Sequence, residues 1–224
     1  MKKESFKKVA IVTVFAIAMA FLEAAVVIYL RRLFYVGGFS FPLKGFLETS
    51  VTNIEWAREF FTIVMLVSIA LLAAKKFYER FTYFLYAFAV WDIFYYIWLK
   101  ASLGWPASLL TWDVLFLIPF PWVGPVLAPL IVSVTMVAFA FIIFNLTDKG
   151  RNVKFSFLES SGLIIGTIAI LFTFLYDYGK LLLSNNLDLF LSYIPTAYNW
   201  IVFAVGEIFI ICAIVLFYLR NKKE

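Results

Sequence analysis

GWPASLLTWDVLFLIPFPWVGPVLAPL, which runs from Gly104 to Leu130, decides how the chain is organised, because it is apolar but cannot form one straight helix. Its second half contains Pro119, Pro121, Pro125 and Pro129. Each proline lacks a backbone N–H and crowds the preceding turn, so we predict a broken helix over about 106–118 and a new helix that starts near Pro125. At membrane depth, non-helical backbone is tolerated where protein or a water-filled cavity covers it. We therefore expect this stretch to form one wall of an internal cavity, with Asp113 facing inward.

The composition is that of an integral membrane protein. The 224 residues are 64% hydrophobic and 15% charged, and the mean hydropathy is +0.96, outside the range of ordinary soluble domains. Histidine is absent and Cys212 is the single cysteine. We therefore predict no cofactor: no haem with histidine ligation and no zinc site. We attribute the net charge of +5 to basic residues at helix ends and expect no nucleic-acid partner.

Apolar runs predict the fold class, which is all-α. We expect a polytopic membrane helix bundle, because about 20 apolar residues in a helix cross the roughly 30 Å of hydrocarbon. The predicted spans are about 9–30, 55–74, 81–99, 126–146, 158–178 and 200–219. The broken segment before the fourth span is expected to be re-entrant or interfacial, and residues 184–199 to form a surface helix and loop. The whole chain, 1–224, is expected to be one transmembrane domain.

The distribution of Lys and Arg predicts the orientation. Six spans place both termini on one side of the membrane. If that side is cytoplasmic, thirteen of the nineteen basic residues lie in cytoplasmic segments, which is the positive-inside pattern. The outer six are Arg31, Arg32, Lys44, Arg58, Lys100 and Lys180. We therefore predict that the N-terminus and the C-terminus are both cytoplasmic.

This orientation brings several acidic residues to one level of the membrane. Glu23, Asp92 and Glu207 fall between mid-membrane and the outer ends of their spans, and Glu55, Arg58, Glu59 and Asp113 lie close to the same level. Residues 55, 58, 59 and 62 follow the i, i+3, i+4, i+7 spacing of one helix face. An ionised side chain at the bilayer centre costs about 2.5–3.5 kcal/mol on insertion scales. We therefore predict an outward-facing polar pocket that these residues share.

The expected pocket has more acids than bases. Its six acids (Glu23, Glu55, Glu59, Asp92, Asp113, Glu207) exceed its three arginines (Arg31, Arg32, Arg58) by three charges. Bound protons or a bound cation could balance the excess. If the cation is a hard metal ion such as Mg²⁺ or Ca²⁺, Glu23, Asp92 and Asp113 are the candidate ligands. The nearby aromatic residues, Tyr95, Tyr96, Trp105 and Trp112, suit an organic cation through cation–π contact.

Structural roles compete with these functional ones. Arg58 with Glu55 or Glu59, and Arg31 or Arg32 with Glu23, could be ion pairs that fix helix packing. Ser161, Gly162 and Gly166 have the small-residue spacing that lets membrane helices approach closely, and we interpret them as packing residues.

Four segments carry a resemblance to a known family. They are LEAAVVIYLR (Leu22 to Arg31), EWARE (Glu55 to Glu59), WDIFYYIWLK (Trp91 to Lys100) and the proline-rich stretch from Gly104. Together they resemble an uncharacterised family of small six-span prokaryotic integral membrane proteins, over roughly the first 130 residues. The resemblance implies the prokaryotic inner (cytoplasmic) membrane and assigns no reaction. In topology alone, the chain is also similar to the substrate-binding components of energy-coupling-factor transporters.

Three functions remain open from the sequence, and whether the protein is an enzyme is undecided. The leading hypothesis is a pocket that binds or transports a cation, a proton or a small cationic solute. The second is an intramembrane enzyme that acts on a lipid or isoprenoid by carboxylic-acid catalysis, with Arg58 holding the head group. The third is an accessory subunit of a larger membrane complex. The expected partners are membrane lipid, a small cation or lipid-like ligand, and a second copy or another membrane subunit.

Overall fold

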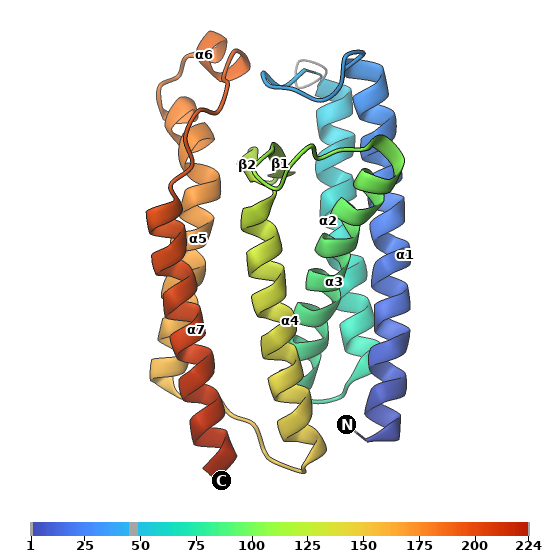
Figure 1. Cartoon of the computed structure of the whole chain (residues 1–224), viewed down its shortest axis with the longest axis vertical. Coiled ribbons are helices and arrows are strands. Elements are labelled where there is room, and N and C mark those ends of the chain that lie inside the picture. Colours follow the sequence, from blue (N-terminus) through green and yellow to red (C-terminus); the bar gives the residue numbers. More distant parts are fainter. Residues whose placement is uncertain (1, 45–48, 224) are drawn as a thin grey trace.

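The computed structural model describes residues 2–44 and 49–223, and these residues form seven helices and one two-stranded hairpin. The helices are α1 (Lys3–Phe34), α2 (Thr49–Ala73), α3 (Phe77–Leu103), α4 (Leu127–Asp148), α5 (Phe157–Leu183), α6 (Leu187–Leu191) and α7 (Trp200–Lys223). The strands are β1 (Trp112–Phe116) and β2 (Trp122–Pro125). The chain is thus an all-α bundle with little strand (Figure 1).

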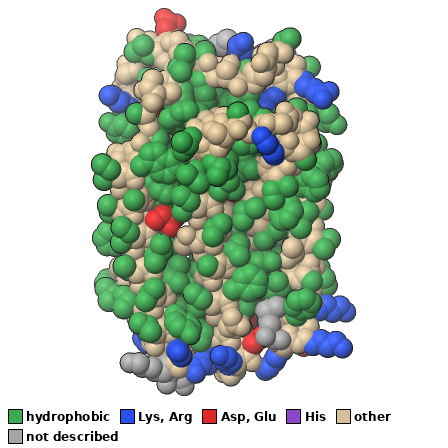
Figure 2. All heavy atoms as spheres, viewed as in Figure 1, with side chains coloured by type: hydrophobic (Ala, Val, Ile, Leu, Met, Phe, Trp, Pro, Cys, Tyr) green, Lys and Arg blue, Asp and Glu red, His purple; other side chains and the backbone are tan. Residues whose placement is uncertain are grey.

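All helices except α6 are long and apolar enough to cross a membrane. Each of the six predicted spans coincides with one of these helices, and most of the helices extend several residues beyond the predicted limits. Figure 2 shows hydrophobic side chains over the middle of one face and Lys and Arg towards its two ends, as expected for a protein surrounded by lipid. The short helix α6 confirms the predicted helix and loop over 184–199.

The helices form two groups. Helix α3 packs against α1, α2 and α4, whereas the main partner of α5 is α7. Both termini lie at one end of the bundle, here called the termini end (Figure 1). The hairpin and residues 35–44, which follow α1, lie towards the opposite end, here called the hairpin end. This arrangement agrees with an even number of spans, while the side of the membrane that each end faces stays a prediction.

The segment from Pro106 to Ile118 contradicts the prediction of a broken helix. It contains a turn and then β1, which pairs antiparallel with β2, so that Asp113 lies opposite Gly124. A helix would leave Pro119 and Pro121 to disrupt its last turn, whereas a hairpin places both prolines in the connection between strands. The β-branched and aromatic side chains of the strands also favour extended backbone. The predicted fourth span begins directly after this hairpin, at Leu127.

Helices α5 and α7 approach closely at glycine. A Cβ atom on Gly166 would lie 2.6 Å from the backbone oxygen of Gly206, and one on Gly162 would lie 3.0 Å from the Cβ of Ala213. No side chain fits at the first position without moving one of the helices. The interpretation of Gly162 and Gly166 as packing residues is confirmed.

Candidate functional site

A cavity of about 150 Å³ lies between α1, α2, α3 and β1. It is called here the hairpin-end cavity. Six of the seven charged residues predicted for the pocket line it, together with two of the four predicted aromatic residues. These are Glu23, Glu55, Arg58, Glu59, Asp92, Asp113, Tyr95 and Tyr96. Residues from four separate elements therefore converge on one space.

Arg58 joins α1 and α2 across this cavity. Its guanidinium pairs with Glu23 of α1, and its Nη2 donates to Oε2 of Glu55 at 2.7 Å. Thr62, one turn further along α2, donates to Oε2 of Glu23 at 3.1 Å. The alternative that Arg58 forms an ion pair with Glu55 is confirmed. Because two carboxylates already engage this guanidinium, it is poorly placed to hold a phosphate head group.

Glu59 ties the hairpin to α2. Its side chain is 5% exposed, and its Oε2 accepts a hydrogen bond from the backbone N–H of Leu117 at 2.8 Å. Leu117 follows β1, where the chain has left helical geometry. The carboxylate thus satisfies a backbone donor that a helix would have satisfied internally, which shelters the non-helical backbone.

Arg31 fixes β1 over the end of α1. Its Nη2 donates to Oδ1 of Asp113 at 2.8 Å, and both side chains are buried. The guanidinium carbon lies 3.7 Å from the ring centre of Trp105 and 4.5 Å from that of Phe39. Burial raises the pKa of Asp113 to about 6, although the positive charge of Arg31 opposes this shift. Beside the cavity, aromatic rings and a carboxylate therefore already enclose one planar cation, the guanidinium of Arg31.

Of the carboxyl groups that line the cavity, Asp92 is the one whose charge is least compensated by neighbouring groups. Its Oδ2 accepts a hydrogen bond from the Ser133 hydroxyl at 2.8 Å. Within residues 2–44 and 49–223, no ion pair involves Asp92. Trp91, Tyr95 and Tyr96, its neighbours on α3, line the same cavity. The arrangement combines a carboxyl group that lacks a cationic partner with several aromatic side chains.

Three predicted pocket residues lie elsewhere. Glu207 is buried on α7, where it accepts a hydrogen bond from Thr135 of α4 at 3.1 Å, and it does not line the cavity. Trp105 stacks on Arg31, and Trp112 packs edge-on against Tyr198 with ring centres 6.1 Å apart. Glu207 is separated from the other acids because α7 belongs with α5 rather than with α1–α3.

The balance of acidic and basic residues in the cavity therefore differs from the predicted one. Arg32 is exposed and does not line the cavity. Lys44, from the α1–α2 connection, does line it. Five carboxyl groups therefore face three basic side chains, Arg31, Arg58 and Lys44, and the excess of acid is two rather than the predicted three.

The metal interpretation is not supported by the positions of its ligands. Among the described residues, no group of three acidic, histidine or cysteine side chains could hold a metal ion. Glu23 is engaged by Arg58 and Asp113 by Arg31, so these carboxylates and that of Asp92 point to three different partners. Arg31 pairs with Asp113 and not with Glu23, so the structure does not support the alternative of an Arg31–Glu23 ion pair.

Sequence reasoning missed several residues that complete the site. Ser133 contacts Asp92 from α4, and Phe39 stacks on Arg31 from the loop after α1. The Leu117 N–H contacts Glu59. A serine in an apolar run and a phenylalanine in a loop are common in membrane proteins, so neither gave a signal. Thr62 was detectable, because it falls on the helix face of Glu55, Arg58 and Glu59.

Comparison with known proteins adds no assignment. No family model matches the chain, and neither the curated proteins nor the solved structures gave a significant match. The six apolar helices define the class as a polytopic membrane protein. The resemblance to an uncharacterised prokaryotic family stays a prediction.

Proposed function

We propose that the hairpin-end cavity binds a small organic cation, such as an ammonium compound, and that Asp92 is its counter-ion. The observation that carries this proposal is the position of Asp92. It lines the cavity and accepts a hydrogen bond from one serine hydroxyl, and among the residues that the structure describes no cationic side chain pairs with it. A lone ionised carboxylate in this position is costly, and a bound cation would remove that cost.

The aromatic lining favours an organic cation over a hydrated metal ion. Tyr95, Tyr96 and Trp91 line the same cavity as Asp92, and cation–π contacts are worth up to about 2 kcal/mol when the cation is desolvated. Arg31, held between Trp105 and Phe39 beside Asp113, is an internal example of the same recognition. A hard cation would instead need several oxygen ligands around one point.

The volume of the cavity limits the size of the ligand. About 150 Å³ is below the roughly 300 Å³ at which pockets for drug-sized ligands begin, and close to that of an engineered cavity that holds benzene. A ligand with a single ammonium group and few carbon atoms fits this limit.

A pair of matched ligands tests the proposal. Choline and its neutral isostere 3,3-dimethyl-1-butanol have nearly the same shape and differ in charge. We expect choline to raise the melting temperature of the purified protein in a saturable manner, and the alcohol to have no such effect. The Asp92→Asn variant should lower the affinity for choline at least about tenfold, a loss of about 1.4 kcal/mol.

Glu207→Gln is the control, since it neutralises an intramembrane carboxyl outside the cavity. It should leave the choline response unchanged. Equal responses to choline and the alcohol, or an unaltered response in Asp92→Asn, would refute the proposal.

A further inference from the structure

A second cavity lies at the termini end of the bundle. Its volume is about 250 Å³, and it is called here the termini-end cavity. Charged and hydroxyl side chains line most of it, among them Lys8, Glu79, Thr82, Tyr83 and Asp148. Asp148 of α4 accepts a hydrogen bond from the backbone N–H of Lys2 at 2.8 Å, which closes the start of α1 onto the end of α4. The cavity is thus a polar space, unlike the apolar core beside it.

The two cavities share the same helices. Residues of α1, α2 and α3 line both of them. On α3, the termini-end cavity reaches Tyr83 and the hairpin-end cavity reaches Trp91, a separation of about 12 Å at about 1.5 Å rise per residue. The layer of protein between the two cavities is therefore about 12 Å thick along α3 and about 22 Å thick along α1, where Lys8 and Glu23 are the nearest lining residues.

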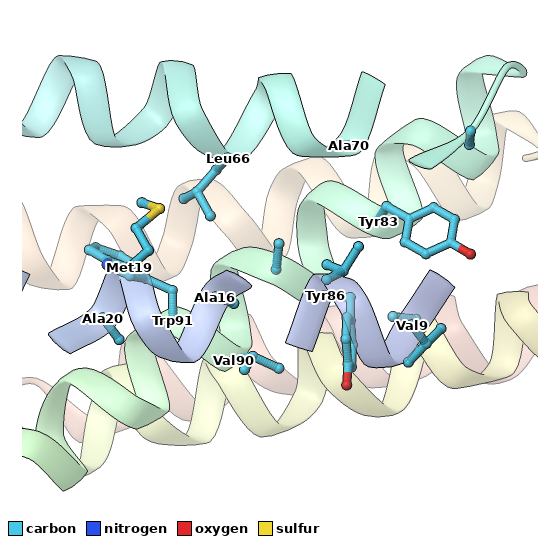
Figure 3. Packing of buried hydrophobic residues seen from close by; sticks show 14 of the residues in the cluster. Val9, Ala16, Met19, Ala20, Leu66, Ala70, Tyr83, Tyr86, Val90 and Trp91 are labelled. Atoms are coloured by element: carbon cyan, nitrogen blue, oxygen red, sulfur yellow. The ribbon is translucent and has the colours of Figure 1, made fainter. Parts of the chain in front are cut away.

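This layer is a packed apolar core in which alanines lie among larger side chains. Ala16 and Ala20 of α1 and Ala87 of α3 are fully buried in it, and Leu66 of α2 packs against them. Figure 3 shows Ala16, Val90 and Leu66 between Trp91 on one side and Tyr83 on the other. Small side chains let membrane helices approach closely, so α1 and α3 meet tightly at Ala16, Ala20 and Ala87, here called the alanine layer.

One polar pair crosses the layer. The Thr13 hydroxyl donates to the backbone oxygen of Val9 at 2.8 Å and lies 2.8 Å from the Tyr86 hydroxyl. Since the proton of Thr13 points to Val9, the Tyr86 hydroxyl is the donor to Thr13. The pair joins α1 to α3 between the two cavities and leaves lone pairs of the Tyr86 oxygen free to accept or to face a cation.

We infer that the two cavities are the entry and release sites of one transport path for the cation, and that Thr13 and Tyr86 with the alanine layer form its gate. The inference rests on the proposed function, because it needs the hairpin-end cavity to bind a cation. In this structure the gate is closed. Opening requires α1 and α3 to part at the alanine layer, and the Tyr86 oxygen then contacts the cation where it has lost its water.

Choline uptake tests the path separately from choline binding. The full chain is reconstituted in vesicles of phosphatidylethanolamine and phosphatidylglycerol, and uptake of radiolabelled choline is driven by a potassium diffusion potential, negative inside. We expect time-dependent uptake that protein-free vesicles lack. Tyr86→Phe and Thr13→Val, which delete the same hydrogen bond from its two sides, should each reduce the initial rate at least about tenfold without changing the choline-induced shift in melting temperature.

Tyr198→Phe is the matched control. Its hydroxyl lies 2.7 Å from that of Thr173 and forms the same kind of pair outside the path, so uptake should be unchanged. Choline binding without uptake by the wild type would overturn the transport inference and leave the proposed function intact. Unchanged uptake in Tyr86→Phe and Thr13→Val would overturn the gate. Absence of binding by the wild type would instead refute the proposed function and, with it, this inference.

Discussion

Around the hairpin-end cavity, α1 and α2 are joined by Arg58 and its two carboxylates, whereas α5 and α7 meet backbone to backbone at Gly166 and Gly206. Close packing of small residues stabilises a helix pair within a membrane without any charge. Buried ion pairs are poor sources of stability, because desolvation offsets most of their attraction. The charges of the first region are therefore weak evidence for a packing role, which is compatible with the cation site that we propose.

The largest expected effect is on the first region. Arg58→Met leaves Glu23, whose side chain is 11% exposed, and the buried Glu55 without their shared cation. Breaking a buried pair in this way costs about 3–5 kcal/mol, which denaturant unfolding in micelles would measure. Adding Glu23→Gln and Glu55→Gln to Arg58→Met should recover most of the lost stability. The loss of an exposed ion pair changes stability by less than about 1 kcal/mol. If Arg58→Met alone has so small an effect, the charges of Arg58, Glu23 and Glu55 are not coupled as described.

The second region should respond to size rather than to charge. In Gly166→Ala, the new Cβ would lie 2.6 Å from the Gly206 oxygen, and such overpacking typically costs about 1–3 kcal/mol. Gly179→Ala is the control on the same helix, because its Cβ would lie 3.5 Å from the Phe120 ring, an ordinary contact. That variant should be neutral or up to about 1 kcal/mol more stable, since alanine favours the helix. Equal unfolding curves for the two variants would show that α5 and α7 do not approach closely.

The pH dependence of cation binding probes the charge of the cavity. Because burial raises the pKa of Asp113 to about 6, this residue is largely neutral at pH 5 and largely ionised at pH 7. A cation binds more tightly when the cavity carries more negative charge, so choline affinity should rise several-fold between these values. The contribution of Asp113 is the part of the rise that Asp113→Asn removes, and an identical pH profile in this variant would contradict the assignment.

The smallest effect is expected at the exposed end of α1. Lys8 lies 3.5 Å from Glu4, but these side chains are 45% and 85% exposed. Exposed pairs contribute about 0–1 kcal/mol, so Lys8→Met should hardly alter the unfolding curve. If Lys8→Met lowered the free energy of unfolding as much as Arg58→Met, the exposed pair and the buried pair would contribute equally. That result would contradict the special role given to burial around Arg58.

The membrane spans could be predicted from the sequence because the signal is physical and local. Long apolar runs ended by charged residues, as at Arg31 or at Asp148, leave little choice but a spanning helix. The shared face of Glu55, Arg58 and Glu59 follows from helical spacing in the same way. The glycine contacts of α5 were also predictable, although their partner on α7 was not.

The hairpin and the pairing of charges could not be predicted, because they depend on contacts between distant segments. Prolines indicate where a helix fails, but Pro119 and Pro121 do not specify what replaces it. Arg31 pairs with Asp113 rather than Glu23 because the hairpin returns over the end of α1. Glu207 has the depth of the other acids, yet its helix belongs to the other group. The sequence therefore predicts the depth of a residue in the membrane. The side of the bundle that the residue faces depends on how the helices pack, which only the fold shows.

Equilibrium dialysis of radiolabelled choline against the purified protein is the most direct test of the account. We predict saturable binding of one choline per chain, which Asp92→Asn weakens at least about tenfold and Glu207→Gln leaves unchanged, since one carboxyl group faces the cavity and the other lies between α4 and α7. No saturable binding, or equal loss in both variants, would contradict the claim that the carboxyl groups beneath the hairpin form a cation site.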